Sequence, residues 1–168
     1  MFKKILLAVL VALPMSAMAQ KFGVVNLETL FTSLPAYSAM ENEVNASSKQ
    51  YEETTQKLMD EVNNLVAEYQ KIEPDPAVQN SIKELRRQEI EDKYRKVETF
   101  RNNAIQELQN LRATRMAPIE KTVTEAIKAV GAEGGYTMIL PNEPALLLYT
   151  GSDVVDLTET IKARLPKE

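Results

Sequence analysis

Paired carboxylates are the residues of this chain that come nearest to a catalytic pattern. Pairs such as Glu52-Glu53 and Glu91-Asp92 could serve as acid and base in glycoside hydrolysis or bind a hard cation. Adjacent residues of a helix point in different directions, however, and each pair has a cation within one turn, so we interpret the pairs as solvated helix faces. The sequence has no His, Cys or Trp, which excludes Ser-His and Cys-His nucleophiles, disulfides and ordinary zinc sites. We therefore predict that the protein is not an enzyme and has no cofactor and no metal.

Two features that could bind anions have simpler interpretations. The glycine-rich stretch 131–135 follows a predicted helix, so the helix dipole opposes an anion there and a C-terminal cap is the better interpretation. The basic residues between Lys83 and Arg101 are interleaved with acidic ones, and the net charge of the chain is −4. Nucleic-acid binding is disfavoured, because it depends on clustered Lys and Arg. A patch for an acidic partner or a lipid head group is the alternative.

The first 19 residues have the pattern of a secretory signal. Lys3 and Lys4 precede an apolar run at 5–13, and Ala17 and Ala19 supply the small side chains that a signal peptidase reads. An uncleaved anchor is the alternative, but nine apolar residues are too few for a bilayer that needs about twenty. We predict cleavage between Ala19 and Gln20 and a periplasmic protein without stable membrane insertion. The mature chain then has 18 cations against 24 anions.

The elements that position all other side chains begin with a long helical hairpin at 36–117. No glycine lies between residues 24 and 130, and the only prolines between 36 and 117 are Pro74 and Pro76, which we place at the tip. Heptad spacing of apolar residues on both sides of the tip predicts a coiled-coil arm. In this arm the residue numbers of facing positions add up to about 148, so that Tyr51 faces Val97. Pro118 should end the second helix of the arm, and a separate helix should follow it.

The two ends of the mature chain are predicted to form a β-containing oligomerisation body, 20–35 plus 118–168. Strands are expected at 22–27, 136–140 and 145–149, with the last two joined as a hairpin, and Asp156 should cap a final short helix. The fold class is therefore α+β, mostly α. A body of about 60 residues whose strands are apolar on both faces is marginal alone, which predicts an oligomer.

Tyrosines and methionines on the arm are the candidate contacts for a partner, because both are adaptable apolar side chains. Packing in the seam between the two helices is the alternative, above all for Tyr51 and Tyr94. The candidates are Met40, Tyr51, Met59, Tyr69 and Tyr94.

The ends of the chain resemble the Skp/OmpH family of periplasmic chaperones. The likeness covers the mature chain and is carried by residues 21–31 (KFGVVNLETLF), 134–140 (GGYTMIL), 147–149 and 153–161, on either side of the helical hairpin. It implies a homotrimer whose three arms enclose a cavity that holds unfolded outer-membrane proteins without ATP. This chain is acidic where well-known relatives are strongly basic, which disfavours the lipopolysaccharide contact of some members. The residues that would build the trimer body are Val24, Val25, Leu27, Met138, Ile139, Leu147 and Leu148.

These inferences predict an ATP-independent holdase for unfolded outer-membrane proteins. The alternative is a structural coiled-coil spacer or tether of the cell envelope that has no unfolded clients. Small polar residues such as Ser47, Ser48 and Thr54 beside the heptad line favour the holdase, because a spacer gains from a tightly packed, unbroken rod.

Overall fold

The structure, a computed structural model, describes residues 20–167, so the predicted signal lies outside the described residues. The described chain is mostly helical with one small sheet, which confirms the predicted α+β, mostly α class. It divides into two compact units. The strand unit comprises residues 20–30 and 124–165, and the hairpin unit comprises 31–123 and 166–167.

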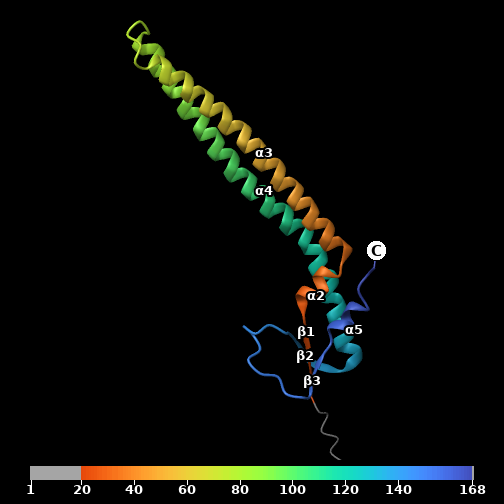
Figure 1. Cartoon of the computed structure of the whole chain (residues 1–168). Helices are drawn as coiled ribbons and strands as arrows, with labels where there is room; N and C mark the ends of the chain where they lie inside the picture. Colours follow the sequence, from red (N-terminus) through yellow and green to blue (C-terminus); the bar gives the residue numbers. More distant parts are fainter. Residues whose placement is uncertain (1–19, 168) are drawn as a thin grey trace, which may run out of the picture. The chain divides into compact units, whose positions relative to one another are not determined.

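Two long helices form the hairpin unit and run side by side (Figure 1). After the short α2 (Leu27–Thr32), α3 spans Pro35–Ile72 and begins with a proline, which is favoured in the first turn because its missing N–H needs no partner there. The chain then turns at 73–79 and continues as α4 (Asn80–Gly134). The tip at Pro74 and Pro76 is confirmed, and the Lys83 Nζ holds it by donating hydrogen bonds to the carbonyls of Glu73 and Asp75 at 2.8 and 2.7 Å.

The register between α3 and α4 differs from the predicted one. Glu61 binds Lys93, and the Tyr51 ring lies edge-on to Phe100 at 6.0 Å. The predicted pairing, in which the numbers of facing residues sum to about 148, places residue 87 opposite Glu61 and residue 97 opposite Tyr51. The observed partners therefore lie six and three residues further along α4. The tip is the reason, since it extends to residue 79 and thus moves the start of α4. Apolar positions of the two helices still meet, and Val97 remains buried in the seam.

The prediction that Pro118 ends a helix is wrong, because Pro118 lies inside α4, which is 55 residues long. Proline inside a helix removes one backbone hydrogen bond and costs about 3 kcal/mol. The buried Ile119 and Val123 on the next turn offset this cost, since burying such side chains contributes about 1.5 to 3 kcal/mol each. The Thr122 hydroxyl also donates to the Pro118 carbonyl at 3.0 Å.

Three parallel strands form the sheet of the strand unit. β1 (Lys21–Val25) lies between β2 (Tyr136–Pro141) and β3 (Val154–Asp156), and it pairs in parallel with both. The predicted strand at 145–149 and its hairpin are therefore wrong. A hairpin would make adjacent antiparallel partners, whereas parallel strands need a longer connection, which residues 142–153 supply between β2 and β3.

The core of the strand unit packs α5 (Thr158–Lys162) close to the sheet. The predicted final short helix is confirmed as α5, and the apolar residues on and beside it, Leu157, Ile161 and Leu165, are all buried. Gly23 permits a close approach on β1, since a Cβ atom there would lie 2.6 Å from the Leu157 side chain. The Asp156 carboxylate accepts hydrogen bonds from the Thr158 amide and hydroxyl at 2.9 and 2.6 Å, as expected of a helix cap.

Candidate functional site

The seam of the hairpin is narrow and is supplemented by ion pairs between the helices. Glu61 binds Lys93 at 2.7 Å, and Arg115 binds both carboxylate oxygens of Glu43 at 2.8 Å. The hydrogen bonds from Arg115 lower the pKa of the Glu43 carboxyl, so both partners stay charged. Exposed pairs of this kind add little stability because water screens them, so they serve mainly to specify the register.

The five candidate contact residues lie in different surroundings. Tyr51 and Tyr69 are half-buried, and Tyr51 packs on Phe100 of the other helix, as the seam interpretation expects. Met40 is only 4% exposed and lines a cavity rather than the open surface. Tyr94 is 46% exposed and lines a shallow depression together with Met59. The structure thus brings Met59 and Tyr94 together and places the other three apart from them.

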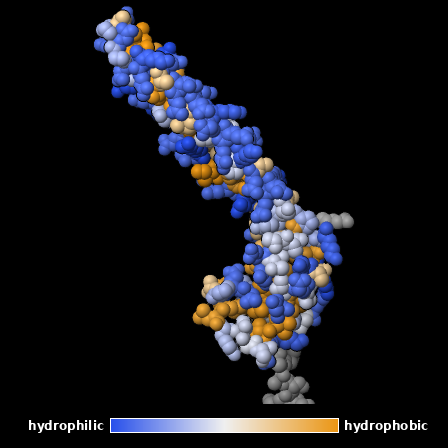
Figure 2. Space-filling view, viewed as in Figure 1, coloured by the Kyte–Doolittle hydropathy of each residue, from blue (hydrophilic) through white to orange (hydrophobic). Residues whose placement is uncertain are grey.

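An apolar stripe on α4 connects two depressions of the hairpin. Tyr94, Arg101 and Ile105 are spaced by seven and four residues, which puts them on one helix face. Arg101 lines both depressions, the one that holds Met59 and Tyr94 and the one that holds Tyr51 and Ile105. Arg101 forms no ion pair with any other residue of the range 20–167, and Ile105 is 53% exposed. Against a mostly hydrophilic hairpin (Figure 2), Tyr94 and Ile105 offer apolar contacts next to Arg101, and the charged residues Glu91, Arg95 and Glu98 also line the depression of Tyr94.

Sequence reasoning missed Ile105. The signal that could have found it is an isoleucine outside the predicted heptad line, next to the buried Ala104. An apolar side chain in such a position has no partner in the seam and must face solvent or another molecule. The same reasoning applies to Ile82 and Leu85, which are exposed nearer the tip.

The residues predicted for oligomerisation fall into three groups. Val24 and Val25 are buried in the core of the strand unit itself, and Leu27, Ile139 and Leu147 are half-buried. Met138 and Leu148 are 48% and 94% exposed. The sequence prediction left out further exposed apolar residues of the same unit, which are Phe22, Leu140, Leu146, Tyr149 and Val155.

Exposed apolar side chains gather on one face of the sheet and in the connection at 142–153. Phe22 pairs with Met138 across the parallel ladder, and partners in such a ladder point to the same face. Leu140 follows two residues later on the same face. Parallel sheets are usually covered on both faces, so this face has the character of an interaction surface. Orange patches mark apolar residues of this unit in Figure 2.

The exposed apolar residues of the two units are surfaces of a kind that other chains can bind. The family described as outer membrane protein (OmpH-like) matches residues 21–165, and the chain belongs to this family. Membership supports a chaperone of outer-membrane proteins in the periplasm as the class of the protein. None of the curated proteins gives a significant match. Among the described residues, no helix combines the length and the apolar character that a membrane crossing requires.

Proposed function

We propose that the protein is an ATP-independent holdase that binds unfolded outer-membrane proteins in the periplasm. The observation that carries this proposal is the family match over residues 21–165, which spans both units. The N-terminal signal pattern adds the route of export, with cleavage after Ala19.

The surface of the hairpin supports the proposal through its physical character. Its apolar side chains are scattered, partly exposed and set among charges, so each contact with a client is weak and short-lived. Such contacts suit a chaperone that must accept many sequences and release them without ATP. The stripe of Tyr94, Arg101 and Ile105, together with Met59, is the client-binding surface that we assign.

Assembly into a homotrimer completes the proposal. The exposed apolar face of the strand unit supplies the contact between copies, through Phe22, Met138 and Leu148. Three hairpins carried on one trimeric body would enclose a cavity for the client. The trimer and its cavity are expectations from the family likeness, and the uncovered apolar face supports them.

The test of the holdase is the aggregation of a denatured outer-membrane β-barrel protein after dilution from urea. Light scattering should stay low when the mature protein is present in molar excess without ATP, and it should rise when bovine serum albumin replaces it. Unchanged aggregation would contradict the holdase and favour the spacer or tether of the cell envelope.

A further inference from the structure

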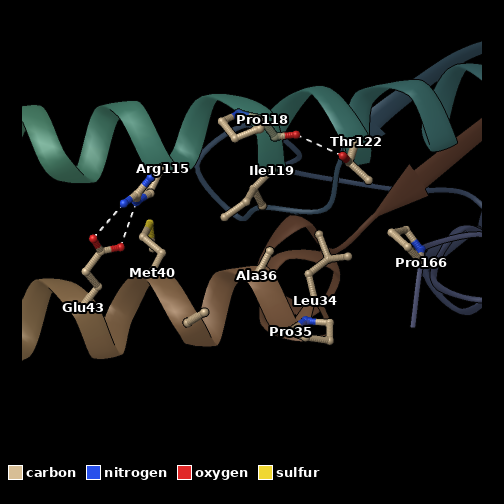
Figure 3. Close-up of a pocket in the computed structure, with 11 residues that line it drawn as sticks. Leu34, Pro35, Ala36, Met40, Glu43, Arg115, Pro118, Ile119, Thr122 and Pro166 are labelled. Carbon is tan, nitrogen blue, oxygen red and sulfur yellow. Dashed lines mark hydrogen bonds and ion pairs between the residues drawn. The ribbon is translucent and has the colours of Figure 1, made fainter. Parts of the chain in front are cut away.

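An apolar cavity of about 320 Å³ lies between α3 and α4 at the root of the hairpin (Figure 3). Leu34, Ala39 and Met40 line it from the start of α3, and Pro118 and Ile119 line it from α4. All of these residues belong to the hairpin unit. The volume is at the lower end of the range of about 300 to 1,000 Å³ that is typical of ligand pockets.

Small side chains leave the edge of the cavity open. Ala36 and Ala39 line it and are exposed, whereas the seam residues Val44 and Val62 are buried. Closely packed interiors leave few voids, because unfilled apolar volume costs stability. The cavity is open to the outside, so an apolar group from another molecule can fill it.

The polar groups of the lining are already paired. Glu43 and Arg115 stand at one end of the cavity and neutralise each other through two hydrogen bonds of 2.8 Å. The Thr122 hydroxyl donates to the Pro118 carbonyl and is thereby satisfied. An ion in the cavity would find no unpaired charge to bind. A neutral apolar group could be buried there without disturbing the ion pair.

Met40 makes the cavity adaptable. Its flexible thioether chain is almost fully buried at the inner wall, where it can adjust to aromatic or branched aliphatic shapes. We propose that this root cavity takes one large, neutral apolar side chain of an unfolded client polypeptide. The inference rests on the proposed function and adds to it a pocket apart from the stripe of Tyr94, Arg101 and Ile105.

The test compares two leucine variants of the full mature protein. Ala39→Leu fills the cavity, and Ala67→Leu makes the same exchange at an exposed site of α3 that does not line it. The probe is a peptide that copies one strand of an outer-membrane β-barrel protein, with a single Phe or with Ala in its place. Wild type and Ala67→Leu should prefer the Phe peptide about tenfold, and Ala39→Leu should lose this preference.

A second measurement needs no variant. The Phe of the peptide is replaced by benzoyl-phenylalanine, and cross-links to wild-type protein should map to Met40 or Ile119. Cross-links spread along the hairpin would overturn the proposal for the cavity, and so would an undiminished preference for the Phe peptide in Ala39→Leu. The holdase proposal would still stand if the protein prevents aggregation. Loss of the trimer in Ala39→Leu alone would mean that a second copy occupies the cavity, which also overturns the proposal.

Discussion

At the scale of single residues, the Asp156 carboxylate ties the end of β3 to the start of α5. It accepts two hydrogen bonds from Thr158, and the buried Thr158 hydroxyl in turn accepts one from the Asn26 amide at 2.9 Å. We predict that Asp156→Ala lowers the free energy of unfolding of the strand unit by about 1 kcal/mol, because the carboxylate is partly exposed. Urea unfolding with hydrogen exchange of the β1 amides measures this, and Asp153→Ala is the control. An effect as large in Asp153→Ala would contradict the capping role.

The same carboxylate predicts a pH dependence. The Thr158 hydroxyl and amide lower the pKa of Asp156 below its ordinary value of 3.8. A lowered pKa in the folded state means that the contribution is complete above the ordinary pKa and is lost as the pH falls through the folded value. The stability difference between wild type and Asp156→Ala should therefore be constant from pH 7 to 5 and shrink below about pH 4. A difference that persists at pH 2 would assign it to side-chain packing instead.

Two residues of the α4 stripe carry a prediction about client binding. Tyr94→Ser together with Ile105→Ser should weaken binding of an unfolded outer-membrane protein about tenfold, because two partly exposed apolar contacts are lost. Ile82→Ser together with Leu85→Ser removes as many exposed apolar groups nearer the tip, where neither residue lines the two depressions. Binding followed by fluorescence of a labelled client distinguishes the pairs. Equal losses in both would show that the stripe has no special role.

At the scale of elements, α4 tolerates its proline at a cost that can be measured. Pro118→Ala should stabilise the hairpin by about 1 to 3 kcal/mol, because the lost helical hydrogen bond to the Thr114 carbonyl returns. Ala113→Pro, one turn earlier, should destabilise it by about 3 kcal/mol. Thermal unfolding followed by far-UV circular dichroism measures both. A lower midpoint for Pro118→Ala would mean that the ring stabilises the hairpin through its packing.

The sequence patterns that extend over many residues predicted the elements best. The heptads and the glycine-free run predicted both helices of the hairpin and its tip, since residue spacing within each segment is enough to determine such elements. The register, the passage of α4 through Pro118 and the place of β3 depend on contacts between distant segments. For example, the apolar run at 145–149 reads as a strand locally, but it lies in the connection that parallel pairing of β3 requires. For the same reason the burial of Met40 could not be foreseen, whereas the exposure of Ile105 follows from its place outside the heptad line and was overlooked.

At the scale of the whole molecule, assembly should depend on the exposed residues of the strand unit. Leu148→Asp should reduce the trimer to smaller species, because it places an unpaired charge in the proposed contact while the chain's own core is untouched. Leu85 is also an exposed leucine but lies on the hairpin, so the control Leu85→Asp should leave the trimer intact. Multi-angle light scattering at micromolar concentration measures the mass. A stably folded wild-type monomer would contradict the trimer itself.

The central place of β1 in its sheet has a consequence for the order of synthesis. Its partners, β2 and β3, are made more than a hundred residues later. Each of the two helices between these strands is held by contacts that are local in the sequence and can form while the chain is still growing. The first strand must wait, with Val24 and Val25 uncovered, until β2 and β3 have been made. A chain cut short by translation or proteolysis before residue 154 therefore has a finished hairpin but leaves one edge of β1 unpaired, and only molecules that include β3 complete the strand unit.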